Sequence, residues 1–298
     1  MTDDLREERD SLTLHCPITA DLALLRARLR DFATIAGLSG PRLDDLIIAV
    51  NEATGNVLVH GGAGTLTARA DAVGVQVDVI DDAGTLTAGH LDRMPDPATH
   101  HGFGLYVIRK LCDEVQLDHP AGRSRLRLSM RYAPATSPEE SGPRSAPAGP
   151  KALRQAALAS PRPDAAARKD DERMPPLTLG HRHLPGITII TLTGELDATN
   201  AEQLQTFIRQ CRQTPADELI FDLAGLHFID STGLRVLLDA STEALGHGGQ
   251  VHLAAPHDMP ARLLDVTGVS LGLPIHDSLT DALDAATPPP SGTTTSTP

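Results

Sequence analysis

The segment AVNEATGNVLVHG, residues 49–61, decides the fold of the first half of the chain. Apolar residues at helical spacing predict a helix over about 41–60, which ends at a Gly-Gly pair. Glu52, Asn56 and His60 share one face of this helix, beside its apolar stripe. A carboxylate and a carboxamide one turn apart suit phosphoryl transfer, in which one orients or deprotonates a hydroxyl and the other binds Mg²⁺. Spacing alone also leaves open a solvated helix face.

The segments around this helix predict an α+β sandwich, with helices packed on an antiparallel sheet. Helical spacing predicts one helix at 20–36 and another that runs from about Gly102 through Cys112. A loop rich in Asp, Pro and His is expected at 85–101. Alternating apolar residues and turn signals predict five strands, at 12–16, 65–71, 75–81, 114–118 and 124–131.

Two loops of this predicted domain carry residues suited to nucleotide binding. One strand ends in Asp81, Asp82, Ala83 and Gly84, where a carboxylate can accept a hydrogen bond from an adenine amino group. Further along, Gly102 and Gly104 stand at the start of a helix, where glycines let backbone amides approach phosphates. No third glycine follows at Rossmann spacing, so this is not a dinucleotide fingerprint.

Composition excludes several classes of function. The net charge of −13 argues against a groove that binds a phosphate backbone, and 2% aromatic residues argue against a stacking platform for single strands. The three cysteines are scattered, so neither a disulfide framework nor a CxxC zinc site is expected. The acidic N-terminus is unlike a signal peptide, and no stretch of 18 apolar residues could span a bilayer. We therefore expect a cytoplasmic protein without a nucleic-acid or membrane partner.

The chain divides into two predicted domains, at 12–132 and 177–286. A Pro- and Ala-rich linker is expected at 133–176, and disordered tails at 1–11 and 287–298. The second domain is predicted to be a small α/β domain with a parallel strand pair. Its strands are expected at 177–183, 187–194, 218–223 and 250–255, its helices at 199–212 and 231–245, and a loop, AGLHFID, at 224–230.

Taken in order, the motifs of residues 12–131 resemble those of the anti-sigma factor serine kinases, which have the Bergerat ATP-binding fold of the GHKL superfamily. AVNEATGNVLVHG resembles their N box, DDAG (81–84) their adenine box, and HGFGLYVIRKLCDEVQL (101–117) their second glycine box. GRSRLRLSM (122–130) matches the closing strand, with Ser124 where the family usually has Thr.

This resemblance implies a protein serine/threonine kinase that uses ATP and Mg²⁺. Glu52 is the implied catalytic base, and Asn56 the Mg²⁺ ligand. The other implied cofactor-binding residues are His60, Asp81, Asp82, Gly84, Gly102, Gly104 and Ser124. Asp82 fits the family's Asp-x-Gly literally, whereas alternation along the strand favours Asp81, so both remain candidates for the adenine ligand.

In the second domain, Asp230 and Ser231 lie where the apolar segment LHFI meets a helix. On its own this placement is explained by a helix N-cap. The surrounding sequence, GITIITLTGELDATNAEQL followed by ELIFDLAGLHFIDSTGLRVLL, resembles the STAS domains of anti-sigma factor antagonists. In that family the partner kinase phosphorylates the serine of the DSxG turn, so the resemblance implies phosphorylation of Ser231, with Asp197 at a family position near it.

Together the two resemblances predict a partner-switching regulator of sigma-factor-dependent transcription, in which a kinase is fused to its typical substrate. The implied partners are a sigma factor, other anti-sigma or antagonist proteins, and the chain's own second domain. A homodimer through the kinase domain is left open. The alternative is a non-catalytic, nucleotide-binding interaction protein, whose STAS domain binds, or is phosphorylated by, a separate anti-sigma kinase.

Overall fold

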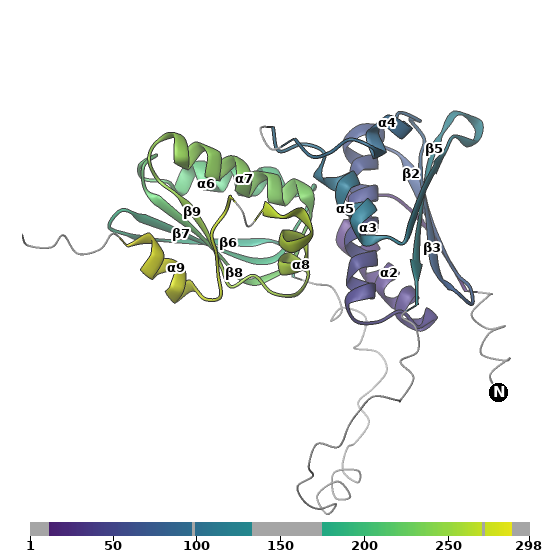
Figure 1. Ribbon diagram of the computed structural model, residues 1–298, viewed down its shortest axis with the longest axis horizontal. Helices are drawn as coiled ribbons and strands as arrows, with labels where there is room; N and C mark the ends of the chain where they lie inside the picture. The colour runs from purple at the N-terminus through teal and green to yellow at the C-terminus, as the bar shows by residue number, and fades with distance from the viewer. Residues whose placement is uncertain (1–11, 97–98, 133–174, 270–271, 288–298) are drawn as a thin grey trace, which may run out of the picture.

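The computed structural model describes residues 12–96, 99–132, 175–269 and 272–287. The predicted segment 1–11, nearly all of the predicted linker and the tail after 287 lie outside the described residues. Two α/β units stand side by side (Figure 1).

The first domain is a five-stranded antiparallel sheet with helices on one face, as the sequence predicts. The strand order is β1-β2-β3-β5-β4, and every neighbouring pair is antiparallel. The strands are β1 (Thr13–Pro17), β2 (Gly64–Ala70), β3 (Gly74–Asp81), β4 (Glu114–Asp118) and β5 (Ser124–Arg131). The helices α2 (Leu22–Ala36), α3 (Pro41–Asn56) and α5 (Phe103–Leu111) lie between this sheet and the second domain (Figure 1).

Local sequence explains where the first helix begins and ends. Asp21 caps α2, because its carboxylate accepts a hydrogen bond of 3.1 Å from the Leu24 amide. Gly37 ends the helix with φ of 102°, in the left-handed region that glycine adopts without strain. The buried face of α2 carries the predicted Leu22, Leu25, Leu29 and Phe32, together with Arg26.

The long helix differs from the prediction at its C-terminal end. α3 stops at Asn56, and residues Val57–Gly61 form a π-helix, η1, instead of a further α-helical turn. A π-turn holds more residues than an α-turn, so His60 is rotated relative to the face that exact four-residue spacing predicts. The predicted loop at 85–101 also contains a short helix, α4 (Ala88–Leu91).

The second domain is a five-stranded mixed sheet with the order β10-β9-β8-β7-β6. Only the β6–β7 pair is antiparallel, so the predicted parallel strands are present. The elements that the sequence predicts are β6 (Thr178–Leu184), β7 (Ile187–Leu196), α6 (Ala201–Cys211), β8 (Glu218–Ile229), α7 (Ser231–Gly246) and β9 (Val251–Ala254).

Two parts of the second domain depart from the prediction. The segment expected as a loop at 224–230 continues β8 to Ile229, with register shifts against β7 that accommodate extra residues. Its Leu226, Phe228 and Ile229 are therefore buried strand residues. The sequence patterns predict no element after 255, where the structure has α8 (Asp258–Thr267), β10 (Ile275–His276) and α9 (Leu279–Ala286).

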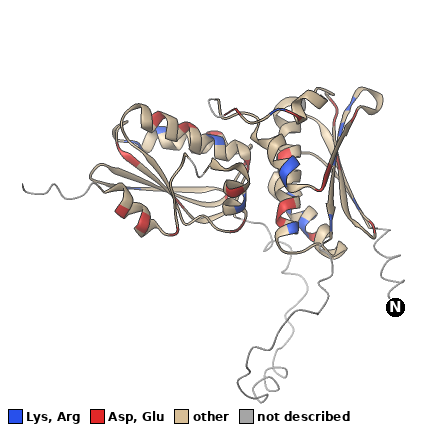
Figure 2. Ribbon diagram, viewed as in Figure 1, with Lys and Arg blue, Asp and Glu red and all other residues tan. Residues whose placement is uncertain are grey.

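The two domains share one continuous apolar cluster, which spans their junction. Buried side chains from α3 and α5 belong to the same cluster as those of β8, α7 and α8. A smaller cluster lies under α9, on the other face of the second sheet. Charged residues of both signs occur on the helices that face each other across the junction (Figure 2).

Candidate functional site

A cleft of about 730 Å³ lies between the two domains and contains most of the predicted site residues. This volume is within the range of small-molecule and cofactor sites. The first domain contributes residues from α3, η1, β3, β5, the 85–104 region and α5, and the second contributes the start of α7. The predicted residues that line the cleft are Glu52, Asn56, His60, Asp81, Gly102, Gly104, Ser124 and Ser231.

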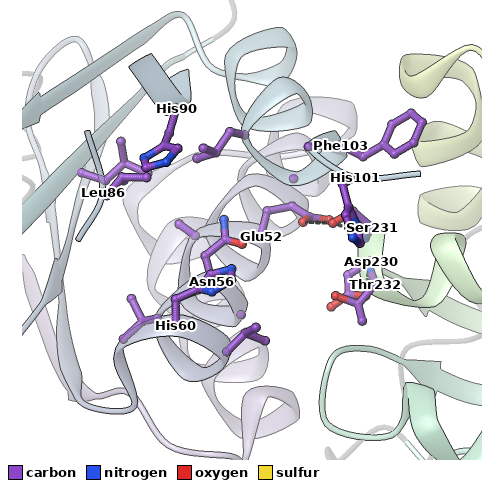
Figure 3. A pocket seen from close by; sticks show the side chains of 18 of the residues that line it. Glu52, Asn56, His60, Leu86, His90, His101, Phe103, Asp230, Ser231 and Thr232 are labelled. Carbon is purple, nitrogen blue, oxygen red and sulfur yellow. Dashed lines mark hydrogen bonds between the residues drawn. The ribbon is translucent and has the colours of Figure 1, made fainter. Parts of the chain in front are cut away.

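Glu52 and Ser231 meet directly across the domain boundary. The Ser231 hydroxyl donates to Glu52 Oε2 over 2.5 Å, and the Ser231 amide donates to Oε1 over 2.6 Å (Figure 3). Both oxygens of one carboxylate are thereby engaged by one residue. The sequence-predicted base and the sequence-predicted acceptor hydroxyl are in hydrogen-bonding contact.

Glu52 is buried at the domain boundary, and its acidity changes as a result. Burial, followed by the nearby Asp230 carboxylate, raises the pKa of Glu52 to about 8, against the lowering effect of the two Ser231 hydrogen bonds. Burial likewise raises the pKa of Asp230, to about 6. A carboxyl group whose pKa is near neutrality is suited to accept a proton during a reaction at that pH.

Asp230, the residue before Ser231, fixes the start of α7 through hydrogen bonds to both of its carboxylate oxygens. One of its oxygens caps α7 by accepting the Thr232 and Gly233 amides, each over 2.9 Å. The other oxygen accepts the Ala198 amide over 2.9 Å and the Asn51 side-chain amide over 3.3 Å. Because Asn51 directly precedes Glu52 on α3, this second bond ties the start of α7 to the helix that carries the predicted base.

Arg26 on α2 is the buried cation of this junction. Its guanidinium donates to Asn51 over 2.5 Å, to Glu195 over 2.5 Å and to Asp197 over 2.7 Å. It also lies over the Phe228 ring, 4.2 Å from the centroid. Two carboxylates and one amide of the two domains therefore converge on a single guanidinium that is only 4% exposed.

The start of α5 is shaped to hold an anion. Gly102 precedes the helix with φ of 88° and offers no side-chain cap to the first amides. A Cβ on Gly104 would lie 2.7 Å from Glu52 Oε2, 3.2 Å from Ser231 Oγ and 3.6 Å from Asn56 Nδ2. A side chain at this position would collide with the carboxylate, so the close approach of the helix start to Glu52 and Ser231 requires glycine. The first amides of α5 border the cleft, where they can bind an anion, and the Asn56 carboxamide lines the same cleft.

The other end of the cleft brings Asp81 and Ser124 together. They are paired neighbours on β3 and β5, both are buried, and both line the cleft. Asp82 and Gly84 do not line it. Asp82 is exposed, 3.7 Å from Arg123, and Gly84 closely approaches the backbone of Gly122. Of the two candidate adenine ligands, Asp81 is thus the one that faces the cleft.

Comparison with known proteins identifies both units. Residues 18–131 match the family model of the histidine kinase-like ATPase domain, and residues 181–282 match that of the STAS domain. The chain joins a GHKL-type ATPase domain to a STAS domain. The resemblance and the fold class that the sequence predicts are confirmed by these matches.

The similar proteins include anti-sigma-F factor antagonists. One from Paenibacillus polymyxa is 29% identical over 108 residues, which cover 36% of this chain and 92% of that protein. One from Mycobacterium tuberculosis is 26% identical over 98 residues, covering 33% of this chain and 80% of that protein. The crystal structure of an anti-sigma factor antagonist from Mycobacterium paratuberculosis is 26% identical, with a TM-score of 0.35, and the match covers 37% of this chain and 94% of that one.

Further contacts join the ATPase and STAS domains outside the cluster around Arg26. Arg262 of α8 donates to both oxygens of Asp45, over 2.8 and 3.2 Å. His100 Nδ1 lies 2.7 Å from Asp239 on α7. Beside this pair, an Nη1 of Arg235 lies 3.3 Å from His101 Nδ1. His100 and His101 of the ATPase domain thus contact α7 of the STAS domain.

Sequence reasoning missed the residues that hold the two domains together. Arg26, Asn51 and Arg235 were not singled out, because each lies in a helix whose apolar spacing explains the neighbouring residues. A basic residue on the buried side of the α2 stripe was the one available signal for Arg26. The described residues contain no helix with the length and apolarity to cross a membrane, and no group of three or more potential metal-binding His, Cys, Asp or Glu residues.

Proposed function

We propose that the ATPase domain is a serine kinase whose substrate is Ser231 of the STAS domain in the same chain. The observation that carries this proposal is the paired hydrogen bond from the Ser231 hydroxyl and amide to the Glu52 carboxylate. A nucleophile hydrogen-bonded to its base beside an anion-binding helix start is the arrangement that phosphoryl transfer requires.

ATP with Mg²⁺ supplies the transferable γ-phosphoryl group and neutralises charge on the phosphates. In the proposed step, Ser231 Oγ forms a bond to the γ-phosphorus while the bond from that phosphorus to the β,γ-bridging oxygen breaks. The bonding electron pair leaves with ADP, and the hydroxyl proton passes to Glu52 Oε2. The start of α5 would hold the phosphates, Asn56 would hold Mg²⁺, and Asp81 with Ser124 would hold the adenine ring.

The product is expected to separate the two domains. Phosphorylation adds about −1.5 to −2 charges to Ser231. Ser231 lies against Glu52 and directly follows Asp230, so the new charge would face two carboxyl groups in a buried site. We propose that this repulsion undocks the STAS domain and exposes the faces of both domains. A sigma factor, an anti-sigma factor or another antagonist would then bind there, which is partner switching within one chain.

Incubation of the full chain with γ-labelled ATP and Mg²⁺, followed by mapping of the labelled residue, tests the proposal. We expect label on Ser231, with Thr232 as the adjacent fallback, and no label on the STAS domain in Ser231→Ala. Transfer within one chain is first order, so its rate constant should not change over a tenfold dilution. Mixing Ser231→Ala with Glu52→Ala should give no label, because neither chain holds both groups.

The non-catalytic alternative makes the opposite forecast. If the chain only binds nucleotide and partners, no label appears on any residue, while ATP still binds. Label confined to the serines of 133–174 would also reject Ser231 as the substrate. A rate that falls in proportion to dilution would keep the kinase and reject transfer within the chain.

A further inference from the structure

The charges that line the cleft leave the nucleotide with few cations. Its lining includes the carboxyl groups of Glu52, Asp81 and Asp230, against the guanidinium groups of Arg93 and Arg235. Among the described lining residues, these two arginines are the groups with a permanent positive charge. Arg93 comes from the ATPase domain and is exposed, whereas Arg235 comes from the STAS domain.

Arg235 is positioned at the phosphate end of the cleft. It follows Ser231 by one turn of α7, so both side chains lie on the same face of that helix. Its guanidinium contacts His101, the residue directly before Gly102. Arg235 is therefore one helical turn from the acceptor serine and contacts the residue that precedes the helix start proposed to hold the phosphates. His101 and Ser231 both line the cleft and are labelled in Figure 3.

We propose that Arg235 is a catalytic residue that the substrate domain supplies to the kinase, where it binds the γ-phosphoryl oxygens of ATP. This inference rests on the proposed function. As the Ser231 Oγ–phosphorus bond forms and the bond to the bridging oxygen of ADP breaks, negative charge is shared by the equatorial oxygens. A guanidinium donates two parallel hydrogen bonds to such oxygens. Arginines supplied from outside a nucleotide-binding domain accelerate phosphoryl transfer by about 10³- to 10⁵-fold.

The consequence is that the ATPase domain is incomplete until the STAS domain docks. Docking would bring the nucleophile and the charge-stabilising group to the ATPase domain at the same time, because both belong to α7. The same contact would let the docked chain distinguish ATP from ADP, since only ATP has the phosphate that Arg235 reaches.

Nucleotide binding tests this contact without phosphoryl transfer. In full-length protein carrying Ser231→Ala, which lacks the acceptor, the affinities for ATP and ADP are measured by calorimetry in Mg²⁺. Adding Arg235→Ala should weaken ATP binding by about 10- to 100-fold, the value of a lost hydrogen bond to a charged group, and leave ADP binding within about twofold. Arg235→Lys should restore part of the difference between ATP and ADP affinity, because lysine keeps the positive charge but lacks the paired N–H donors of a guanidinium.

Asp239→Ala is the matched control for loss of docking. Asp239 lies one turn further along α7 and contacts His100, next to the partner of Arg235, but does not line the cleft. The control should keep the ATP preference. An equal loss in Asp239→Ala, or an unchanged ratio of ATP to ADP affinity in Arg235→Ala, overturns the proposal.

The rate of Ser231 labelling tests whether Arg235 also takes part in catalysis. In chains that retain Ser231, Arg235→Ala should lower the rate at saturating ATP by about 10³-fold. A rate equal to that of the parent chain overturns the catalytic role. If the parent chain itself never labels Ser231, the proposed kinase function fails, and the binding comparison still decides whether Arg235 contacts the γ-phosphate.

Discussion

The interface between the two domains has a buried centre and an exposed rim, which differ in what can replace each contact. At the centre, Arg26 is 4% exposed and binds three oxygen acceptors. At the rim, the His100–Asp239 pair includes an aspartate side chain that is 48% exposed. Water can take over a lost rim contact, but the carboxylates around Arg26 have no such replacement while the domains are docked. The centre should therefore set the register of docking, and the rim should adjust its strength.

The largest effect is expected from Glu52, where the centre of the interface coincides with the proposed chemistry. Loss of a positioned base should slow Ser231 phosphorylation by about 10²- to 10⁴-fold in Glu52→Ala, with ATP binding largely kept. Asn56→Ala should also weaken Mg²⁺-dependent ATP binding. Quantitative phosphopeptide analysis gives the rates, with Glu114→Ala on exposed β4 as the control. An unchanged rate in Glu52→Ala would remove this residue from the mechanism.

The next effect belongs to Arg26. Its removal leaves Glu195 and Asp197 without their shared cation, at a cost to docking of about 3–5 kcal/mol. Small-angle scattering should show that Arg26→Ala is more extended than the parent chain. Arg28→Ala, an exposed substitution on the same helix, should scatter like the parent. A compact Arg26→Ala chain would show that the rim alone can hold the domains together.

A smaller effect is expected from pH, through the buried carboxyl at the centre. The pKa of Glu52 is raised in the docked chain from 4.5 to about 8, so docking takes up protons between these values. Docking should weaken as pH rises through this interval, whereas the fraction of Glu52 able to accept a proton should increase. Energy transfer between dyes on the two domains measures docking from pH 6 to 8.5. Glu52→Gln should lose most of the pH dependence, and an unaltered slope in that variant would assign it to other groups.

The smallest effect is expected at the rim. Asp239→Ala removes one exposed partner, so docking should weaken by less than about 1 kcal/mol. The same energy-transfer measurement applies, in low and high salt. A loss as large as that of Arg26→Ala would erase the distinction between the centre and the rim.

Much of the fold follows from the sequence, because local patterns report local structure. The α2 stripe and its glycine stop predict that helix closely, and alternation predicts β2 to β5. The π-helix at Val57–Gly61 was missed, since the period of side chains changes there without a change in composition. The extension of β8 was missed for a related reason. AGLHFID has a turn-like start, but the bulges against β7 absorb its extra residues.

The candidate site was predictable in its parts and not in its assembly. Glu52 and Ser231 could be singled out by their motifs, 179 residues apart, yet nothing local says that they touch. By its spacing Glu52 could equally be assigned to a solvated helix face, because its hydrogen-bond partner Ser231 belongs to the STAS domain. Arg26 and Asn51 owe their importance to residues of the other domain, so a reading of their own helices could not identify them.

The contact between Ser231 and Glu52 has a consequence for how many times one molecule can act. Ser231 Oγ lies 2.5 Å from Glu52 Oε2, so a phosphate that stays on that oxygen would keep its charge against this carboxyl group for as long as the domains remain docked. Substrate and enzyme are one covalent chain with one acceptor, and the product cannot return to the position in which it was made. Each molecule would then catalyse one transfer and stay phosphorylated until a phosphatase removes the phosphate. In a population of such molecules, the phosphorylated fraction would record how many have reacted, and only the phosphatase would reset it.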